Sequence, residues 1–513
     1  MERFLKRHKD RIVGIVAGFD RVLFRGTLRS ISYVQGLEIF LRSQRVLNKD
    51  FVAFAQRATE QVRRQAEAWA RRCGRPYQYL SSSTASKEEY ARTIMKRDGL
   101  REGLICILSC VEPCRTFTVR GNRARRTLDL VPLEGKCLHL YFYFLDREFG
   151  FMHVRLQTWF PFTVQVCVNG REWLARQLDG AGIGYEKRDN CFPRIDRVEK
   201  AQQMMDRLAN RHWKPFLDGW ARRVNCWLRT PPGRQLHGYY WSVRQQEYAT
   251  DVMFHDAASL AQIYPALVRQ AIEQFHSEDV LRFLGRRSLA YYRGEVSSHL
   301  ARRWEGVRVK HRVAENSIKM YDKQGSVLRI ETTMNNPWRF KVRRRISRAG
   351  QPRLAWLRLR KGIADVRRRV QISRAANARY LNALSVVGES QPCSRVLDSA
   401  SRPVLTAGRR FRPLSPVGPL DSPRLALLQD GAFLVDGFRN RDLYPDWQEL
   451  TPCQELSPRQ ITGRITRWLV LLRAHGLIYK VPGSHTYRIT AKGHLLMTTA
   501  ARMRQASIDS LAA

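Results

Sequence analysis

The segment IKMYDKQGSVLRIETT, residues 318–333, places a tyrosine and a carboxylate where they could do chemistry together. Its alternating pattern around Gly325 predicts a β-hairpin, with Tyr321 on one arm and Glu331 on the other. A carboxylate can hold Mg²⁺, which polarises a phosphate, and a tyrosine close to the ion can attack that phosphate as a nucleophile. Tyr321 and Glu331 are therefore the candidate catalytic residues, and Glu331 is also a candidate metal ligand.

Two further carboxylates lie on one predicted strand, QEYATDVMF. Glu247 and Asp251 are separated by an even number of residues, so they share a face of that strand. At about 3.3 Å per residue they are roughly 13 Å apart, too far for one ion to join them directly. The candidate Mg²⁺ ligands are thus Glu331, Asp251 and Glu247.

Other interpretations of these residues remain open. A salt bridge with one of the many arginines would give Glu331 a purely structural role. Tyr291 and Tyr292 in LAYYRGE are alternative nucleophiles. Asp20 follows an apolar strand, a position where nuclease folds often keep an acid.

The order of Tyr321, Asp322 and Lys323, followed by the strand LRIE, resembles a short motif of replication initiators from rolling-circle plasmids and filamentous phages. In those proteins a tyrosine attacks a DNA phosphodiester, helped by a divalent ion on acidic or histidine ligands. The resemblance implies a metal-dependent DNA nickase of a mobile element that acts through Tyr321 and Glu331. The paired histidines around one hydrophobic residue, usual in many such nickases, are absent from the sequence.

A second group of candidate residues lies on the predicted hairpin HLYFYFLDREFGFMHVRLQTWFPF, residues 139–162. One face of this hairpin is apolar, and the other collects rings and bases. Rings on a sheet can stack nucleic-acid bases, and Arg155 would add phosphate contact or cation–π stacking. Alternatively, a helix over 169–180 covers this face and the rings belong to the core. The candidate binding residues are His139, Tyr141, Tyr143, His153, Arg155, Gln157 and Trp159.

The charge of the chain favours a polyanionic partner. Its 513 residues contain 90 Lys and Arg against 46 Asp and Glu, a formal net charge of +44. Such an excess repels itself unless a polyanion neutralises it, and the abundant arginines suit phosphate and base contacts. No stretch approaches the roughly 18 apolar residues that span a bilayer, and no signal-peptide core is visible, so we expect a cytoplasmic protein without a membrane partner. The ten cysteines form no CxxC pair and predict free thiols.

The last part of the chain, LSPRQITGRITRWLVLLRAHGLIYKVPGSHTYRITAKGHLLM, has apolar residues on one face of a predicted helix capped by Ser457. A two-stranded turn and another helix follow. This order resembles the recognition helix, wing and final helix of a MarR-like winged helix-turn-helix. The resemblance implies that the helix enters the major groove of DNA while the wing touches phosphate; the alternative is a winged helix that binds protein. The implied contacts are Arg459, Gln460, Thr462, Arg464, Arg467, Lys480 and His485.

Changes of pattern divide the chain into four parts. We expect a mixed α/β domain over 1–190, a second α+β domain with a basic C-terminal helix over 191–387, a Pro/Ser-rich linker over 388–424 and the winged helix over 425–505. No internal repeat is visible.

The sequence therefore predicts an α+β multidomain protein, with a mixed α/β basic body followed by a C-terminal winged helix. Its expected function is nucleic-acid binding, most of all DNA binding. Two alternatives stay open: a metal-dependent nickase or replication initiator that uses Tyr321, Glu331 and Mg²⁺, and an RNA-binding protein with an open aromatic sheet. Outside the nickase alternative, no cofactor is expected.

Overall fold

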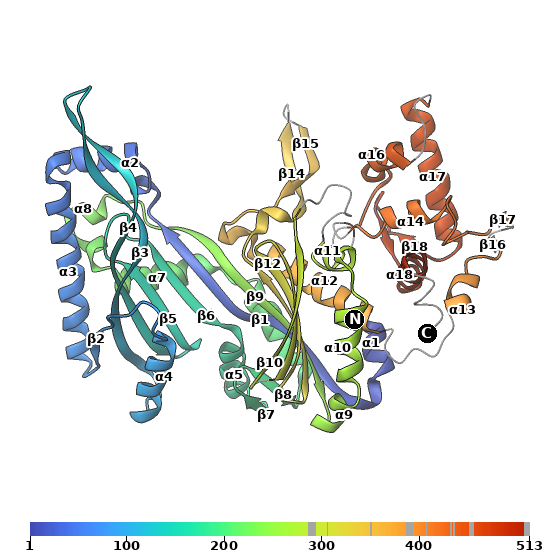
Figure 1. The fold of residues 1–513 in the computed structure, drawn as a ribbon, viewed down its shortest axis with the longest axis horizontal. Helices are drawn as coiled ribbons and strands as arrows, with labels where there is room; N and C mark the ends of the chain where they lie inside the picture. The colour runs from blue at the N-terminus through green and yellow to red at the C-terminus, as the bar shows by residue number, and fades with distance from the viewer. Residues whose placement is uncertain are drawn as a thin grey trace.

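The body of the protein is built on one long β-sheet, seen in a computed structural model (Figure 1). The structure describes the whole chain except residues 286–293, 305, 349–350, 386–392, 407, 431–432, 434–436, 451–455 and 507–513. The sheet has eleven described strands. In spatial order they are β10 (Val296–Arg303), β11 (Gly306–Val313), β12 (Asn316–Lys323), β13 (Val327–Met334), β9 (Tyr240–Phe254), β1 (Ile12–Thr27), β6 (Val164–Asn169), β5 (Gly150–Gln157), β4 (Thr127–Asp146), β3 (Gly103–Asn122) and β2 (Tyr77–Tyr79).

The sheet consists of two halves with the same topology. In the first half β1 pairs with the last strand β6, and β5, β4 and β3 follow outward. In the second half β9 pairs with the last strand β13, and β12, β11 and β10 follow outward. All these neighbours are antiparallel, and β1 and β9 themselves pair antiparallel at the centre. The body is thus an internal structural duplication with approximate two-fold symmetry, which the sequence does not reveal as a repeat.

Helices cover one face of this sheet. The first half carries α2 (Val34–Ser43), α3 (Phe51–Arg72), α6 (Val198–Ala209) and α7 (Trp213–Val224), and the second carries α9 (Ala257–Ala261), α10 (Tyr264–Glu273), α11 (Ser277–Phe283) and α12 (Val366–Leu384). α6 crosses β1 so closely that a Cβ on Gly18 would lie 1.9 Å from Met205. α12 occupies the equivalent place on β9, where Asn377 hydrogen-bonds Thr250 and Thr332. α5 (Gly170–Gly180) continues from β6 and packs beside β1.

The opposite face, called the open face below, is covered only in part. α4 (Lys87–Arg97) packs Ala91 and Ile94 onto Tyr143 and Phe151 at the β3–β5 end. The hairpin of β7 (Tyr185–Arg188) and β8 (Cys191–Ile195) lies against β1, β9 and β13 near the centre. Between these two covers, alternate residues of the central strands face outward, as the period of two in a strand requires.

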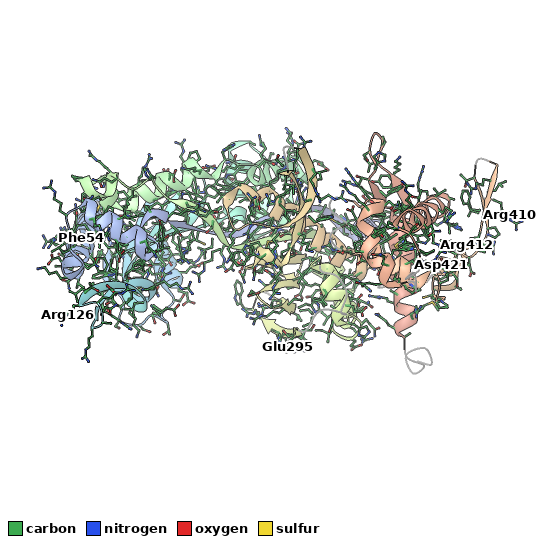
Figure 2. All side chains as sticks on the ribbon, turned by 90° about the horizontal axis from the view of Figure 1, so that it is seen from above. Phe54, Arg126, Glu295, Arg410, Arg412 and Asp421 are labelled. Atoms are coloured by element: carbon green, nitrogen blue, oxygen red, sulfur yellow. The ribbon has the colours of Figure 1, made fainter. Side chains whose placement is uncertain are left out.

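Two pairs of strands extend the body beyond the sheet. β3 and β4 continue together past the point where β5 stops pairing, and β14 (Lys341–Arg348) and β15 (Gln351–Arg358) form a separate hairpin. Both project to the top of Figure 1. In Figure 2 Arg126, at the turn of the β3–β4 hairpin, marks one end of the elongated molecule, and Arg410 lies near the other end.

The C-terminal region has its own hydrophobic core, which includes Ala400, Leu414 and Trp468. Its helices and strands are α13 (Cys393–Asp398), β16 (Val404–Thr406), β17 (Arg409–Phe411), α14 (Ser422–Leu427), α16 (Asn440–Leu450), α17 (Pro458–Ala474), β18 (Ile478–Lys480), β19 (Tyr487–Ile489) and α18 (Ala491–Gln505). Phe438 forms a single bridge to Tyr487 beside the β18–β19 hairpin. Among the described residues no helix is both long and apolar enough to cross a membrane.

The observed elements agree with several expectations and differ from others. The expected hairpins at 139–157 and 318–333 are present. The expected boundary at residue 190 falls within a body whose first and second parts share one sheet, because β1 pairs with β9. The expected linker, where described, contributes α13, β16 and β17, and Ala400 and Leu414 are buried in the C-terminal core.

Tyr143 provides a test of the covered part of the open face. Its side chain is 2% exposed and lies beneath α4, with its ring centroid 5.6 Å from that of Phe151. Tyr143→Ala should lower the free energy of unfolding by about 3 kcal/mol, because it leaves a cavity. The control Tyr79→Ala removes a ring that is 55% exposed and should change stability little. If the Tyr143→Ala variant unfolds at the same urea concentration as the wild type, α4 does not bury this ring.

Candidate functional site

The open face carries a basic groove of about 710 Å³, which we call the cationic groove. It crosses the strands from β3 and β4 to β9, so segments far apart in the sequence build it together. Its lining residues are Arg25, Pro113, Cys114, Arg115, Glu134, Gly135, Lys136, His139, Arg155, Gln157, Thr163, Gln165, Ser242, Val243, Arg244, Asn335 and Lys361.

Positive charge in this groove is poorly compensated. Glu134 is the only acid among the lining residues, and it is largely exposed and paired with Arg115. Arg25 has a lowered pKa because burial disfavours its charge and because Arg244, Arg115 and Arg155 repel it. An anion in the groove would relieve this repulsion.

The floor of the groove includes three of the seven residues that the hairpin pattern singled out. His139 and Gln157 are nearly buried, and Gln157 donates to the backbone oxygens of Arg115, Trp159 and Phe160. Burial lowers the pKa of His139 to about 4, so this ring is neutral at pH 7. Of these three residues in the floor of the groove, Arg155 is the cation.

An acid that the hairpin pattern did not show lies beside these residues. Glu112, on β3, accepts hydrogen bonds from Tyr141 at 2.6 Å and from Arg155 at 2.6 Å. It also forms an ion pair with Lys87 of α4 at 3.0 Å. Because β3 and β4 pair, Glu112 reaches a face whose own two strands carry no acid.

The other four candidate binding residues of the hairpin do not form an open stack of rings. Tyr143 lies under α4, and His153 packs between Tyr141 and Tyr143 with centroids 6.2 and 5.1 Å away. Trp159 packs against Phe51 in the main core. The covering helix is α4; the helix over 169–180, which was expected to do this, is α5 and packs beside β1.

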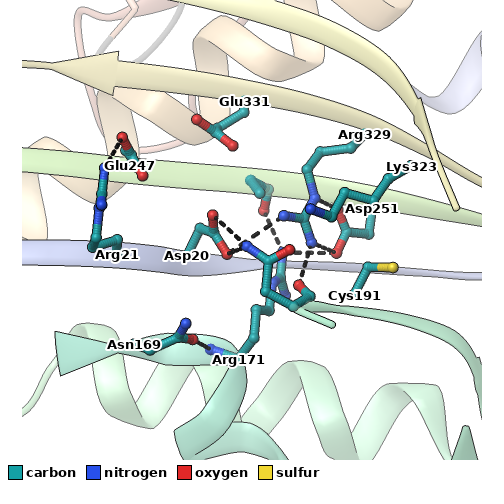
Figure 3. A network of polar contacts seen from close by, with 12 residues as sticks. Asp20, Arg21, Asn169, Arg171, Cys191, Glu247, Asp251, Lys323, Arg329 and Glu331 are labelled. Carbon is teal, nitrogen blue, oxygen red and sulfur yellow. Dashed lines mark hydrogen bonds and ion pairs between the residues drawn. The ribbon is translucent and has the colours of Figure 1, made fainter. Parts of the chain in front are cut away.

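A second hollow of about 360 Å³, called the carboxylate pocket below, lies on the same face near the β7–β8 hairpin (Figure 3). Asp20, Glu247 and Glu331 line it together with Tyr321. A bulge in β1 after Phe19 lets the consecutive residues Asp20 and Arg21 both line this pocket.

Each of these carboxylates already has donors from the protein. Glu331 accepts from Tyr321 Oη at 2.7 Å and from Lys319 Nζ at 2.6 Å. Glu247 pairs with Arg21 at 3.0 Å. Asp20 accepts from the side-chain amide of Asn190 at 2.9 Å.

Their proton affinities differ sharply. Burial raises the pKa of Asp20 to about 6, and Glu331 and Glu247 add to the rise against the opposing effect of Arg329. Burial acts the same way on Glu331, but Lys319 and Arg329 outweigh it and hold its pKa at about 2. Burial and the charge of Glu331 raise the pKa of Tyr321 well above its ordinary value, so this phenol is protonated at pH 7.

Asp251 lies deeper and serves a structural purpose. It is fully buried, and Arg329 contacts it through Nε at 2.6 Å and Nη2 at 2.8 Å. Arg171 adds a third contact at 3.0 Å (Figure 3). Both arginines are also fully buried, so Asp251 neutralises charge that would otherwise be stranded in the protein interior.

The fit of a metal ion can be tested on this geometry. Nowhere in the described residues do three His, Cys, Asp or Glu side chains lie close enough to hold an ion. Among the predicted ligands, Asp251 is enclosed by arginines, and Glu331 and Glu247 are occupied by Lys319 and Arg21. The side chains as arranged therefore do not fit a Mg²⁺ site. Tyr291 and Tyr292 lie outside the described residues.

The predicted residues of the C-terminal region lie at the surface. Arg459, Gln460, Thr462, Arg464 and Arg467 are exposed on α17, while Ile461, Ile465 and Trp468 are buried. Ser457 and Gln460 form the reciprocal cap at its start. Lys480 and His485, on and after β18, are also exposed.

No family model, no curated protein and no solved structure matches the chain.

Sequence reasoning missed most basic residues of the groove, namely Arg25, Arg115, Lys136, Arg244 and Lys361. The available signal was the even spacing of Arg21 and Arg25 on one predicted strand, which places both on one face. Arg244 lies in the same groove as Arg25 because β1 pairs with β9. Lys361 lies there because its backbone oxygen accepts from Val243 N at 2.8 Å.

Removal of the charge on Asp251 tests the buried network. Asp251→Asn should cost about 3–5 kcal/mol of unfolding free energy, because Arg329 and Arg171 lose their shared counter-charge. The matched control is Glu134→Gln, which breaks an ion pair between two exposed side chains and should leave the urea midpoint almost unchanged. Equal midpoints for the two variants would contradict a stabilising role for Asp251.

Proposed function

We propose that the protein binds nucleic acid, most of all DNA, and that the cationic groove is the main contact surface. The observation that carries this proposal is the convergence of Arg25, Arg155, Arg244 and Lys361 on one groove that contains a single acid. These residues come from separate parts of the chain, so folding concentrates the charge. Phosphates in the groove would offset the mutual repulsion that already lowers the pKa of Arg25.

The rest of the chain supports the same partner class. The formal net charge of +44 gives long-range attraction to a polyanion. With DNA as its ligand, the protein is proposed to act in the cytoplasm.

The C-terminal region is proposed to act as a winged helix that reads duplex DNA. In chain order it has α14, the bridged residue Phe438, α16, α17 and the β18–β19 hairpin, which is the order that a winged helix requires. On this proposal α17 enters the major groove through its exposed arginines, and the hairpin with Lys480 and His485 contacts phosphate.

Full-length protein with paired substitutions tests both surfaces in one binding assay. Arg25→Ala with Arg244→Ala should weaken binding about equally for all sequences and lower the salt slope by about 1 per lost phosphate contact. Arg464→Ala and Arg467→Ala should each cost about 1–3 kcal/mol, confined to particular sequences where they contact bases.

The double variant Arg71→Ala and Arg72→Ala is the control, because it removes equal charge from the exposed end of α3. A wild-type protein with no salt-dependent affinity for DNA would refute the proposal. Stronger affinity for RNA of the same length would replace DNA with RNA as the partner.

A second candidate function is DNA nicking, favoured by the hydrogen bond between Tyr321 and Glu331. In such a reaction the Tyr321 oxygen would attack phosphorus while its proton passes to Glu331. The bond from phosphorus to the sugar oxygen would break, and that oxygen would take a proton from solvent and leave as a hydroxyl. The resting geometry positions these groups but does not activate them, because Lys319 keeps the pKa of Glu331 at about 2 and thus makes it a weak base.

Nicking is tested by incubating supercoiled and single-stranded DNA with the protein, with and without divalent ions. If this candidate is right, Tyr321→Phe and Glu331→Gln abolish cleavage while binding persists, and Tyr264→Phe, at another buried tyrosine, does not. Wild-type protein that cleaves no substrate in any divalent ion would leave DNA binding as the only function.

A further inference from the structure

Two basic β-ribbons flank the cationic groove. The first, called arm 1, comprises residues 113–136, where β3 and β4 pair only with each other. Its ten residue pairs reach about 33 Å at 3.3 Å per residue. Phe117 and Leu130 anchor it in the main core, and Asn48 donates to Leu128 O, so one side of the ribbon is braced.

The charge of arm 1 increases toward its end. Arg120, Arg123, Arg125 and Arg126 are exposed at the tip. The one acid near them, Asp129, is occupied by Asn122 and Thr127.

The second ribbon, called arm 2, comprises β14 and β15, which pair only with each other. The sequence from Lys341 to Lys361 contains nine Lys and Arg and no Asp or Glu. Arg344 is tied to Asp365 at the base, and Trp356 packs against the C-terminal core. These contacts fix the ribbon while Arg345 and Arg353 remain exposed.

The groove joins the bases of the two arms. Arg115 and Lys136 belong to arm 1 and line the groove, and Lys361, three residues after arm 2, lines it beside β9. The strands from β4 to β9 span four spacings of about 4.8 Å, or about 19 Å. Figure 1 shows both arms extending from the sheet toward the same side. The groove is therefore the floor of a basic channel with a ribbon on each side.

We propose that the two arms clamp a nucleic-acid duplex above the groove; this inference rests on the proposed function. Three features favour a duplex over a single strand. The channel is about as wide as a double helix, two-stranded ribbons fit a major groove or follow its phosphates, and arginines line both walls. A single strand would instead need exposed rings for stacking, and Tyr143 is buried under α4.

The test uses the full-length protein and a 20-base-pair DNA duplex with one of its strands as the single-stranded probe. Arm 1 loses charge in Arg123→Ala with Arg125→Ala, and arm 2 in Arg345→Ala with Arg353→Ala. Arg126 is left unchanged because its backbone has a φ of 55°. The double variant of Arg71 and Arg72 is the matched control for lost charge, and thermal melting verifies that each variant folds.

Each arm variant should bind the duplex about tenfold more weakly at physiological salt, with a salt slope lower by about 1.8 for two lost phosphate contacts. Its affinity for the single strand should change less than twofold, and the control should bind both probes like the wild type. Unchanged duplex binding by both arm variants, or an equal loss for duplex and single strand, would overturn the clamp. If the clamp alone is wrong, the Arg25 and Arg244 variant still loses affinity; if wild-type protein binds neither probe, the proposed function fails as well.

Discussion

The antiparallel pairing of β1 with β9 is the constraint on which the rest of the molecule depends. These strands pair through fourteen positions, from Ile12 with Phe254 to Thr27 with Tyr240. They join two halves of identical topology into one sheet, so neither half presents its central edge to solvent. The same pairing brings Arg25 near Arg244 and Arg21 next to Glu247, and thereby builds both hollows of the open face.

A sheet whose second face is covered only in part must satisfy the polar residues of that face by other means. In the centre this is achieved by ion pairs: Asp251 with Arg329 and Arg171, and Glu331 with Lys319. These pairs are costly to bury but more costly to break, because removal of one partner leaves a charge in the interior. Farther along the same strands acids are fewer: Arg155 pairs with Glu112 and Arg115 with the exposed Glu134, whereas Arg25 lies against three other arginines.

Local elements could be predicted from the sequence, whereas the site could not. The helix capped by Ser457 and the hairpin around Gly325 follow from patterns within one segment, and the structure contains both. The duplication, the contact between Arg25 and Arg244 and the two arms depend on pairing between distant strands, which no local pattern encodes. Glu112 is a smaller example of a contact that no local pattern shows. The residues of 139–157 on this face include no acid, because the acid that contacts them comes from β3.

The two hollows lie one after the other along β1, so the open face changes along this strand from the basic groove to the pocket that contains carboxylates. Arg25 lies in the cationic groove and Asp20 in the carboxylate pocket, only five residues away, or about 16 Å along the strand. A polyanion that extended from the groove toward this pocket would approach several acids, among them the three carboxylates of Asp20, Glu247 and Glu331. Arg21 and Lys319 neutralise two of these, and the raised pKa of Asp20, about 6, reduces the cost of the third, because a carboxyl with that pKa takes up a proton readily when a phosphate approaches. If the proposed function is right, the acids of the pocket would therefore limit how far the polyanion extends without expelling it from the groove.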